Sequence, residues 1–164
     1  MDDISRLFLQ KSRSLLTSEY PAKIERSVAP LSDENVWWRP NDASNSIGNL
    51  ILHLNGNVGM WILSGVGRLA FERNRQLEFD ERRPIPAAEM LAQLRTTLRR
   101  ADDMVAGLDE NELLSRRQIQ GYDVTVLEAI YHVVEHFGMH TGQIILLSKA
   151  QAAQDLNLWK PVTP

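Results

Sequence analysis

The longest amphipathic segment of the chain, residues 126–152, most constrains its fold. Its apolar residues recur at intervals of three and four, which is the spacing of one face of an α-helix. Thr125 and Glu128 stand three residues apart at its start and form a capping box, so we expect a helix from Val126 to about Ala152. A helix this long needs other elements to cover its apolar face.

Three further segments show the same helical spacing of apolar residues. They cover residues 4–19, about 47–65 and 87–106. Asn45 or Ser44 can cap the second of these helices. Four long amphipathic segments with few strand signals predict an all-α four-helix bundle. A length of 164 residues with 43% hydrophobic residues suits a single domain spanning residues 1–164.

Several residues are expected to interrupt or connect these helices. Pro21 should stop or kink the first helix. Gly56 and Gly59 weaken the second helix, so tight packing of a neighbouring helix is the expected reason for them. Residues 31–45 are expected to form an ordered loop that is tied down by its two tryptophans.

Two other connections have their own patterns. Residues 68–86 are rich in arginine and acidic residues, which is more simply a solvated surface than a binding patch. Residues 118–121 form either a brief extended pair or an irregular crossing before the last helix, and the sequence does not decide between the two. The expected fold is therefore all-α, with a short irregular or extended segment before its last helix.

The composition excludes several classes of function. Without cysteine the chain has no disulfide, no thiolate ligand and no cysteine nucleophile, so any metal must be held by histidine and carboxylate side chains. A formal charge of −3 gives no basic surface for nucleic acid. No stretch reaches about 18 consecutive apolar residues, and the N-terminus has no signal-peptide pattern. We therefore expect a soluble, cytoplasmic protein without nucleic-acid or membrane partners.

Three of the four histidines, His132, His136 and His140, follow one another in the last helix at spacings of four. This spacing stacks side chains one turn apart on a single face. The apolar seam includes His136 and His140, so both imidazoles are expected to point into the bundle. An unpartnered buried polar group costs about 1–3 kcal/mol. A metal ion shared by the pair is favoured over two core histidines that bond carbonyls or water.

A zincin-type peptidase is disfavoured because its general-base Glu directly follows the first His, whereas Phe137 stands at that place here. Glu135 precedes His136 and points away from the metal side. A catalytic site needs a third ligand, and the remaining histidine, His53, is the candidate. The periodicity of the second helix makes His53 half exposed, so an ordinary surface histidine remains an equal interpretation.

Two motifs carry a resemblance to a known family. The sequence W-W-R-P-x-x-x-S-N-S-I-G-N-L-I-L-H at 37–53, together with H-V-V-E-H-F-G-M-H-T-G-Q-I at 132–144, resembles the DinB-like superfamily, named for damage-inducible bacterial proteins. The resemblance covers nearly the whole chain. Residues 140–149 are similar to a branch whose function is undefined. Thr141 stands where many members have Arg, a difference that does not touch the expected ligands.

The resemblance implies a four-helix bundle that holds one divalent metal ion, commonly in a homodimer. Carried onto this sequence, the ligands it implies are His53, His136 and His140. His132 lies outside that triad; it is a candidate for a supporting residue or a fourth ligand, and an ordinary histidine on the bundle face is the preferred interpretation. Gln143 is a candidate to hydrogen-bond a ligand imidazole or a water ligand, or simply to link two helices.

The resemblance also implies an activity. Its characterised relatives include thiol S-transferases and a thiol-dependent isomerase that act with bacterial low-molecular-weight thiols. We therefore predict a protein that uses the metal to activate a small thiol, or water, for S-transfer or hydrolysis of a small molecule. The alternative is a non-catalytic metal-binding bundle with a structural or stress-related role. Zinc and nickel both suit imidazole ligands, and the sequence does not choose between them.

Overall fold

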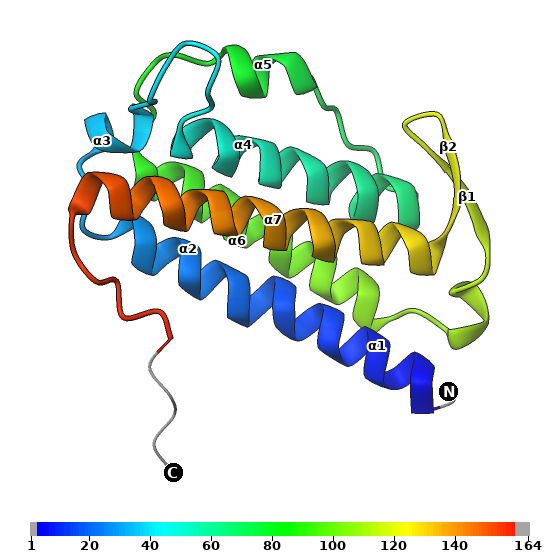
Figure 1. Ribbon diagram of the computed structural model, residues 1–164. Helices are drawn as coiled ribbons and strands as arrows, with labels where there is room; N and C mark the ends of the chain where they lie inside the picture. Colours follow the sequence, from blue (N-terminus) through cyan, green and yellow to red (C-terminus); the bar gives the residue numbers. More distant parts are fainter. Residues whose placement is uncertain (1–2, 160–164) are drawn as a thin grey trace.

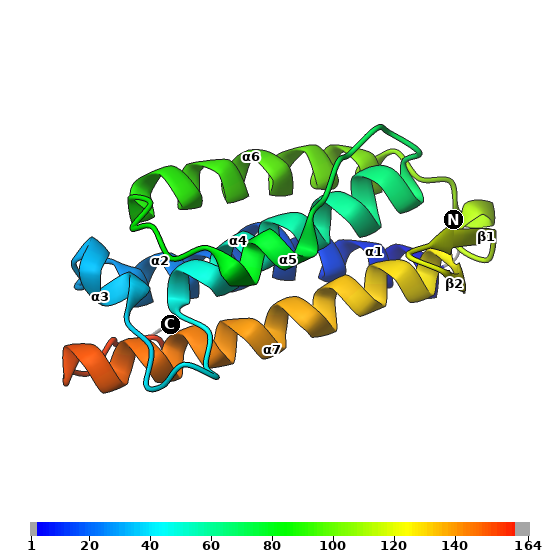
Figure 2. The ribbon, with the colours of Figure 1, turned by 90° about the horizontal axis from the view of Figure 1, so that it is seen from above.

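Four long helical rods form the body of the computed structural model, which describes residues 3–159. The rods are α1 (Asp3–Ser14) continuing through η1 (Leu15–Glu19) into α2 (Tyr20–Val28), α4 (Ile47–Val58) continuing into η2 (Gly59–Val66), α6 (Ala87–Ala106), and α7 (Val126–Ala152). α4 packs against α6 and α7, and α2 packs against α7 (Figures 1 and 2). The predicted all-α four-helix bundle is confirmed.

The connection between the second and third rods gives α4 and α6 the same direction. At one end of the bundle Gly67 lies against Met104, and at the other end Trp37 Nε1 donates to Ile85 O at 2.9 Å. Residues 67–86 therefore run back along the molecule, and they carry the short helix α5 (Arg75–Asp80) over the outer side of α4 (Figure 2). We call residues 67–86 the return segment.

Pro21 lies inside the first rod, which continues past it. The five residues of η1 form a π-helical turn, and the Tyr20 N–H donates to Leu15 O. This wider turn accommodates a residue that has no N–H of its own. The expected interruption at Pro21 thus takes the form of a π-helical segment, and not of a helix end.

The second rod begins at Ile47, as its apolar spacing predicts, but its N-cap is not one of the two expected residues. Ser46, and neither Asn45 nor Ser44, is the N-cap of α4. Its hydroxyl accepts from the Asn49 N–H at 3.1 Å, while Asn49 Oδ1 accepts from the Ser46 N–H at 3.2 Å. The other end of the same amide, Asn49 Nδ2, donates to Glu78 O at 2.9 Å. One side chain thus caps α4 and fastens α5 to it.

The loop expected over residues 31–45 contains the short helix α3 (Asp33–Trp37). Trp37 is buried and lies against Gly48, where the indole leaves no room for a Cβ. Trp38, in contrast, is 43% exposed. The loop is therefore tied down by one of its two tryptophans.

The undecided segment before the last helix is an extended pair. After the 3₁₀ turn η3 (Glu110–Glu112), β1 (Arg116–Ile119) and β2 (Tyr122–Thr125) form an antiparallel hairpin. Gln120 and Gly121 make the two-residue turn with φ of 51° and 85°. Two positive φ values are the geometry that closes a tight hairpin in register with the strand twist.

The interior of the bundle is aliphatic with few polar exceptions. Its fully buried large side chains include Ile24, Ile51, Leu54, Ile62, Leu94, Ile130, Phe137 and Ile144. His53 and His140 are buried among them. In the part of the chain that the structure describes, no helix has both the length and the apolar character needed to cross a membrane.

Candidate metal centre

His53 lies in the middle of α4 and is 3% exposed, so the half-exposed position expected from periodicity is wrong. The cover comes from the return segment. The Phe79 ring centroid lies 4.7 Å from that of His53, and the Glu78 carboxylate contacts the imidazole. Gly56 leaves room for this carboxylate, because a Cβ there would collide with Glu78 Oε1.

His136 and His140 approach His53 from α7. The capping box of Thr125 and Glu128 starts this helix where it was predicted. The ring centroids of His136 and His140 lie 4.9 and 5.0 Å from that of His53, and 4.4 Å from each other. His140 is buried, whereas His136 keeps part of its ring exposed.

The three imidazoles converge on one point. One ring nitrogen from each of His53, His136 and His140 lies within 4.8 Å of the other two, which makes them a group that could hold a metal ion. The shortest approach is 2.9 Å, between Nε2 of His53 and Nε2 of His136. A hydrogen bond across that distance requires a proton on one of the two nitrogens, and a shared ion would replace it.

The second nitrogens of two rings have acceptors of their own. Gln143 Oε1 lies 2.6 Å from His140 Nδ1, so this nitrogen donates and leaves Nε2 with a lone pair. Glu78 Oε2 lies 2.8 Å from His53 Nδ1. Gln143, expected to bond a ligand imidazole or to link helices, contacts an imidazole one turn before it on its own helix.

His132 stands outside the converging group. Its ring lies 4.1 Å from the Trp61 ring and 5.4 Å from the His136 ring, measured between centroids. Its Nε2 is 3.5 Å from Asn57 Nδ2. His132 is therefore a neighbour of the site that packs on Trp61, and the group of three nitrogens does not include it.

Burial and mutual repulsion make the histidines on α7 hard to protonate. Burial, with added repulsion from the charged forms of His140 and His53, lowers the pKa of His136 to about 3. Burial also lowers the pKa of His140, although its bond to Gln143 acts the other way. Neutral imidazoles are the form that binds metal, so the folded chain keeps these rings ready for it.

Glu78 and Arg73 belong to this site, although their segment was expected to be a solvated surface. Both side chains are buried, with 10% and 3% exposed. Arg73 Nε donates to Glu78 Oε1 at 2.6 Å, and Arg73 Nη2 donates to Oε2 at 2.9 Å. Burial raises the pKa of Glu78, but the hydrogen bonds from Arg73 and His53 outweigh it and hold the pKa below its ordinary value. The sequence signal for this contact was Gly56, whose neighbour is the return segment instead of a bundle helix.

A cleft of about 760 Å³ opens beside the converging histidines. It lies between the second rod, the start of α7 and the hairpin, and both His53 and His136 reach its wall. Trp61 and Gln120 also line it, and Trp61 Nε1 donates to Gln120 Oε1 at 3.0 Å. The cleft thus gives molecules from solvent a path to His53 and His136, whereas His140 does not line it.

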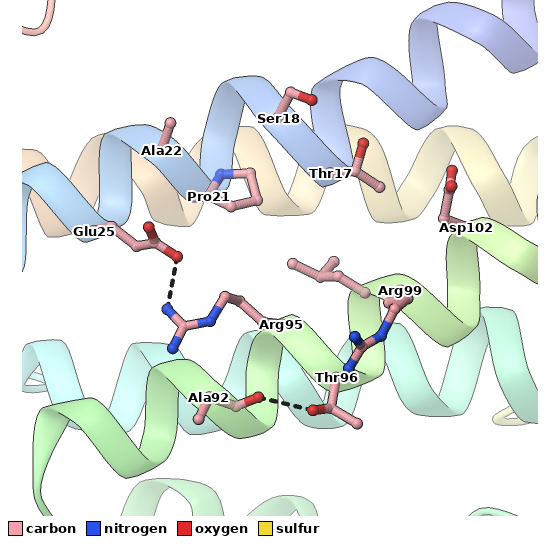
Figure 3. A pocket seen from close by; sticks show the side chains of 11 residues that line it. Thr17, Ser18, Pro21, Ala22, Glu25, Ala92, Arg95, Thr96, Arg99 and Asp102 are labelled. Atoms are coloured by element: carbon pink, nitrogen blue, oxygen red, sulfur yellow. Dashed lines mark hydrogen bonds and ion pairs between the residues drawn. The ribbon is translucent and has the colours of Figure 1, made fainter.

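A second hollow, of about 600 Å³, lies between the first rod and α6 (Figure 3). Its lining contains no histidine. Arg95 points across it to Glu25, with 2.9 Å between Nη1 and Oε1, and the Thr96 hydroxyl donates to Ala92 O (Figure 3). These are ordinary links between and within helices, and the hollow shares no residue with the converging histidines.

The donor set fits a divalent metal ion. Three imidazole nitrogens on two facing helices are a common donor set for zinc and for nickel, and such nitrogens stand about 2.0–2.1 Å from a bound zinc ion. His53 and His140 each use Nδ1 for a bond to an acceptor, so their Nε2 atoms remain available. His53, His136 and His140 are therefore the residues that would hold the ion.

Comparison with known proteins places this arrangement in a family. The family model described as "Protein of unknown function (DUF1572)" matches residues 3–162. Among solved structures, a DinB-like protein from Bacillus cereus ATCC 10987 is similar, with 18% sequence identity, a TM-score of 0.69, and coverage of 91% of this chain and 93% of that one. At this identity the likeness shows the fold. Curated proteins give no match. The chain therefore belongs to the DUF1572 family, and its all-α fold is that of a DinB-like protein.

Proposed function

We propose that this protein is an enzyme in which a divalent ion, held by His53, His136 and His140, activates a small thiol, or water, for group transfer or hydrolysis. The choice of a thiol as the activated group rests on the resemblance to DinB-like proteins. The choice of ligands is supported by the convergence of the three imidazoles. In the transfer reaction the sulfur bonds to an electrophilic carbon. The thiol proton goes to solvent, and the group displaced from that carbon takes up a proton.

The observation that carries the proposal is the cleft beside the histidines. Structural zinc sites are closed by four protein ligands, whereas catalytic sites have three and an open position. Here three imidazole nitrogens converge, His132 is not among them, and His53 and His136 border a cleft of about 760 Å³. This arrangement favours catalysis over a purely structural role.

The described part of the chain offers no free carboxylate base in the cleft. Glu128 lines it, but its Oε2 accepts from the Thr125 N–H at 2.7 Å and the Thr125 hydroxyl at 2.8 Å. Glu78 is bound by Arg73, and Glu135 is exposed and does not line the cleft. When bound, a divalent ion on three neutral imidazoles keeps its charge and lowers the pKa of a thiol or water beside it. A nucleophile of this kind needs no protein base.

Zinc and nickel are the proposed metals, because both accept imidazole nitrogens. Metal analysis of protein purified without a histidine tag tests the site. Turnover of electrophiles with several thiols, in metal-loaded and metal-stripped protein, tests the chemistry. Loss of turnover in His53→Ala, with turnover retained in His132→Ala, is the expected result. Stoichiometric metal without metal-dependent turnover would favour the non-catalytic bundle, and a wild-type protein that binds neither ion would overturn the site.

A further inference from the structure

The imidazole of His53 is held by a buried ion pair that comes from the return segment. His53 Nδ1 lies 2.8 Å from Glu78 Oε2 and 3.2 Å from Arg73 Nη2. Arg73 spans both carboxylate oxygens, at 2.6 and 2.9 Å. The three side chains therefore form one cluster, in which every member is at least nine-tenths buried.

The contacts assign a proton to one nitrogen of His53. Nδ1 faces a carboxylate oxygen, which only accepts, so a bare Nδ1 at 2.8 Å would set two lone pairs against each other. The nearby Arg73 Nη2 is shared with the same oxygen and does not need Nδ1 as its acceptor. The Nδ1–H form is thus favoured, and Nε2 carries the lone pair toward His136.

Other parts of the chain keep the carboxylate in this place. Asn49 Nδ2 donates to the carbonyl oxygens of Glu78 and Glu81, at 2.9 and 3.1 Å. Gly56, three residues after His53, gives the Glu78 carboxylate room against α4. Burying a carboxylate and a guanidinium is costly unless both are paired and hydrogen-bonded, and here they are.

We propose that Glu78 and Arg73 are positioning residues that fix the ring and the tautomer of His53, so that its Nε2 is presented as a metal ligand. The inference rests on the proposed metal site and adds the group that prepares it. A carboxylate behind a ligand imidazole orients the ring and makes it a stronger ligand, and losing such a partner typically weakens metal binding 10–100-fold.

The test compares Glu78→Gln and Glu78→Ala with Asp80→Asn. Asp80 lies on the same short helix and accepts from Gln76, so its substitution removes the same charge without touching His53. Zinc titration against a competing chelator should show about a 10–100-fold loss of affinity in Glu78→Ala. We expect a smaller loss in Glu78→Gln, which keeps an acceptor, and a change within about twofold in Asp80→Asn.

Nitrogen-15 NMR of the metal-free proteins gives a readout that a merely structural residue would not move. Wild type should show His53 protonated at Nδ1, and Glu78→Ala should show both tautomers. This measurement needs no metal, so it tests Glu78 even if the wild type bound no zinc and the proposed function failed. Circular dichroism checks that each variant folds, and Glu78→Gln keeps the test open if Glu78→Ala does not. Unchanged zinc affinity in the folded Glu78 variants, or His53 still fully protonated at Nδ1 in folded Glu78→Ala, would overturn the inference.

Discussion

Among the four histidines, three turn a ring nitrogen to a common point and one does not. His53→Ala, His136→Ala and His140→Ala should therefore each abolish stoichiometric metal binding, since each removes one of three ligands. His132→Ala should leave most of the binding, because its ring packs on Trp61 outside the group. Metal content after gel filtration measures both effects. Loss of the metal in His132→Ala alone would contradict the ligand set.

The low pKa of His136 has a consequence for the metal-free protein. In the unfolded chain this imidazole takes up a proton below about pH 6.5, whereas in the folded chain its pKa is about 3. The unfolded state thus binds more protons between these two pH values. The contribution of His136 to the free energy of unfolding is therefore fully present above pH 6.5 and is lost as the pH falls toward 3.

His136→Gln should remove this part of the pH dependence. The difference in the free energy of unfolding between pH 7 and pH 5 should be smaller in the variant than in the wild type. The reduction is at most about 2 kcal/mol, and it is less than this because the ring is partly exposed. Urea unfolding of the metal-free wild type and variant at both pH values measures it. An equal change in the free energy of unfolding between pH 7 and pH 5 in the two proteins would show that the pKa of His136 is not lowered by folding.

Residue patterns on α7 predicted more of the site than those on α4. The spacing of His136 and His140 predicts that both rings lie on one face of α7, and both approach His53 there, although His136 stays partly exposed. Helical periodicity predicts a half-exposed His53, because the apolar face of α4 marks only its contacts with the other long helices. Its cover is Phe79 and Glu78, which come from a charged segment that returns over α4. Because the return segment buries His53 through single side chains, this burial does not appear in the spacing of apolar residues along α4.

At the scale of elements, the start of α4 joins two tasks in Ser46 and Asn49. Ser46→Ala removes the hydroxyl that accepts from the Asn49 N–H and donates to Asn49 Oδ1. The loss of an N-cap of this kind costs about 0.5–2 kcal/mol. Chemical denaturation should show it, with Ser44→Ala as the control that changes stability by no more than about 0.5 kcal/mol. A larger effect in Ser44→Ala would place the cap where the sequence alone put it.

The helices themselves were predictable because each has its own apolar face and end signals. α6 and α7 have the predicted bounds. The two π-helical segments were not, since π turns leave no distinct apolar period in so short a stretch. Gly59 in the second of them lies against Phe71, whose ring leaves no room for a Cβ. The tight contact expected at Gly56 and Gly59 is thus real, but the partner is again the return segment.

At the scale of the whole molecule, the proposed ion would join α4 to α7, through residues 83 positions apart in sequence. A ligand that binds only the folded state stabilises it by RT ln(1 + [L]/Kd), which is about 2.7 kcal/mol at a hundredfold excess over Kd. Metal should therefore raise the Tm, and His53→Ala should remove most of the increase. Calorimetry with and without chelator measures it.

The metal-free bundle should still fold, because its core is built from aliphatic side chains of all four rods. Two results would contradict this account. A metal-free protein that is unfolded at room temperature would make the ion structural. A metal-dependent shift that persists in His53→Ala would take His53 out of the site. The homodimer implied by the family resemblance stays a prediction, which light scattering checks against the chain mass of 18.7 kDa.

The residues that line the cleft come from two kinds of element, the long helices and the hairpin. The converging imidazoles sit on long helices whose backbones are fixed by the core, whereas Gln120, Tyr122 and Val124 reach the same cleft from a two-stranded ribbon at the end of the bundle. Loops and turns tolerate exchange better than packed helices do. Substitutions in the hairpin can therefore change which molecules the cleft admits, in natural or directed evolution, without moving the three imidazoles.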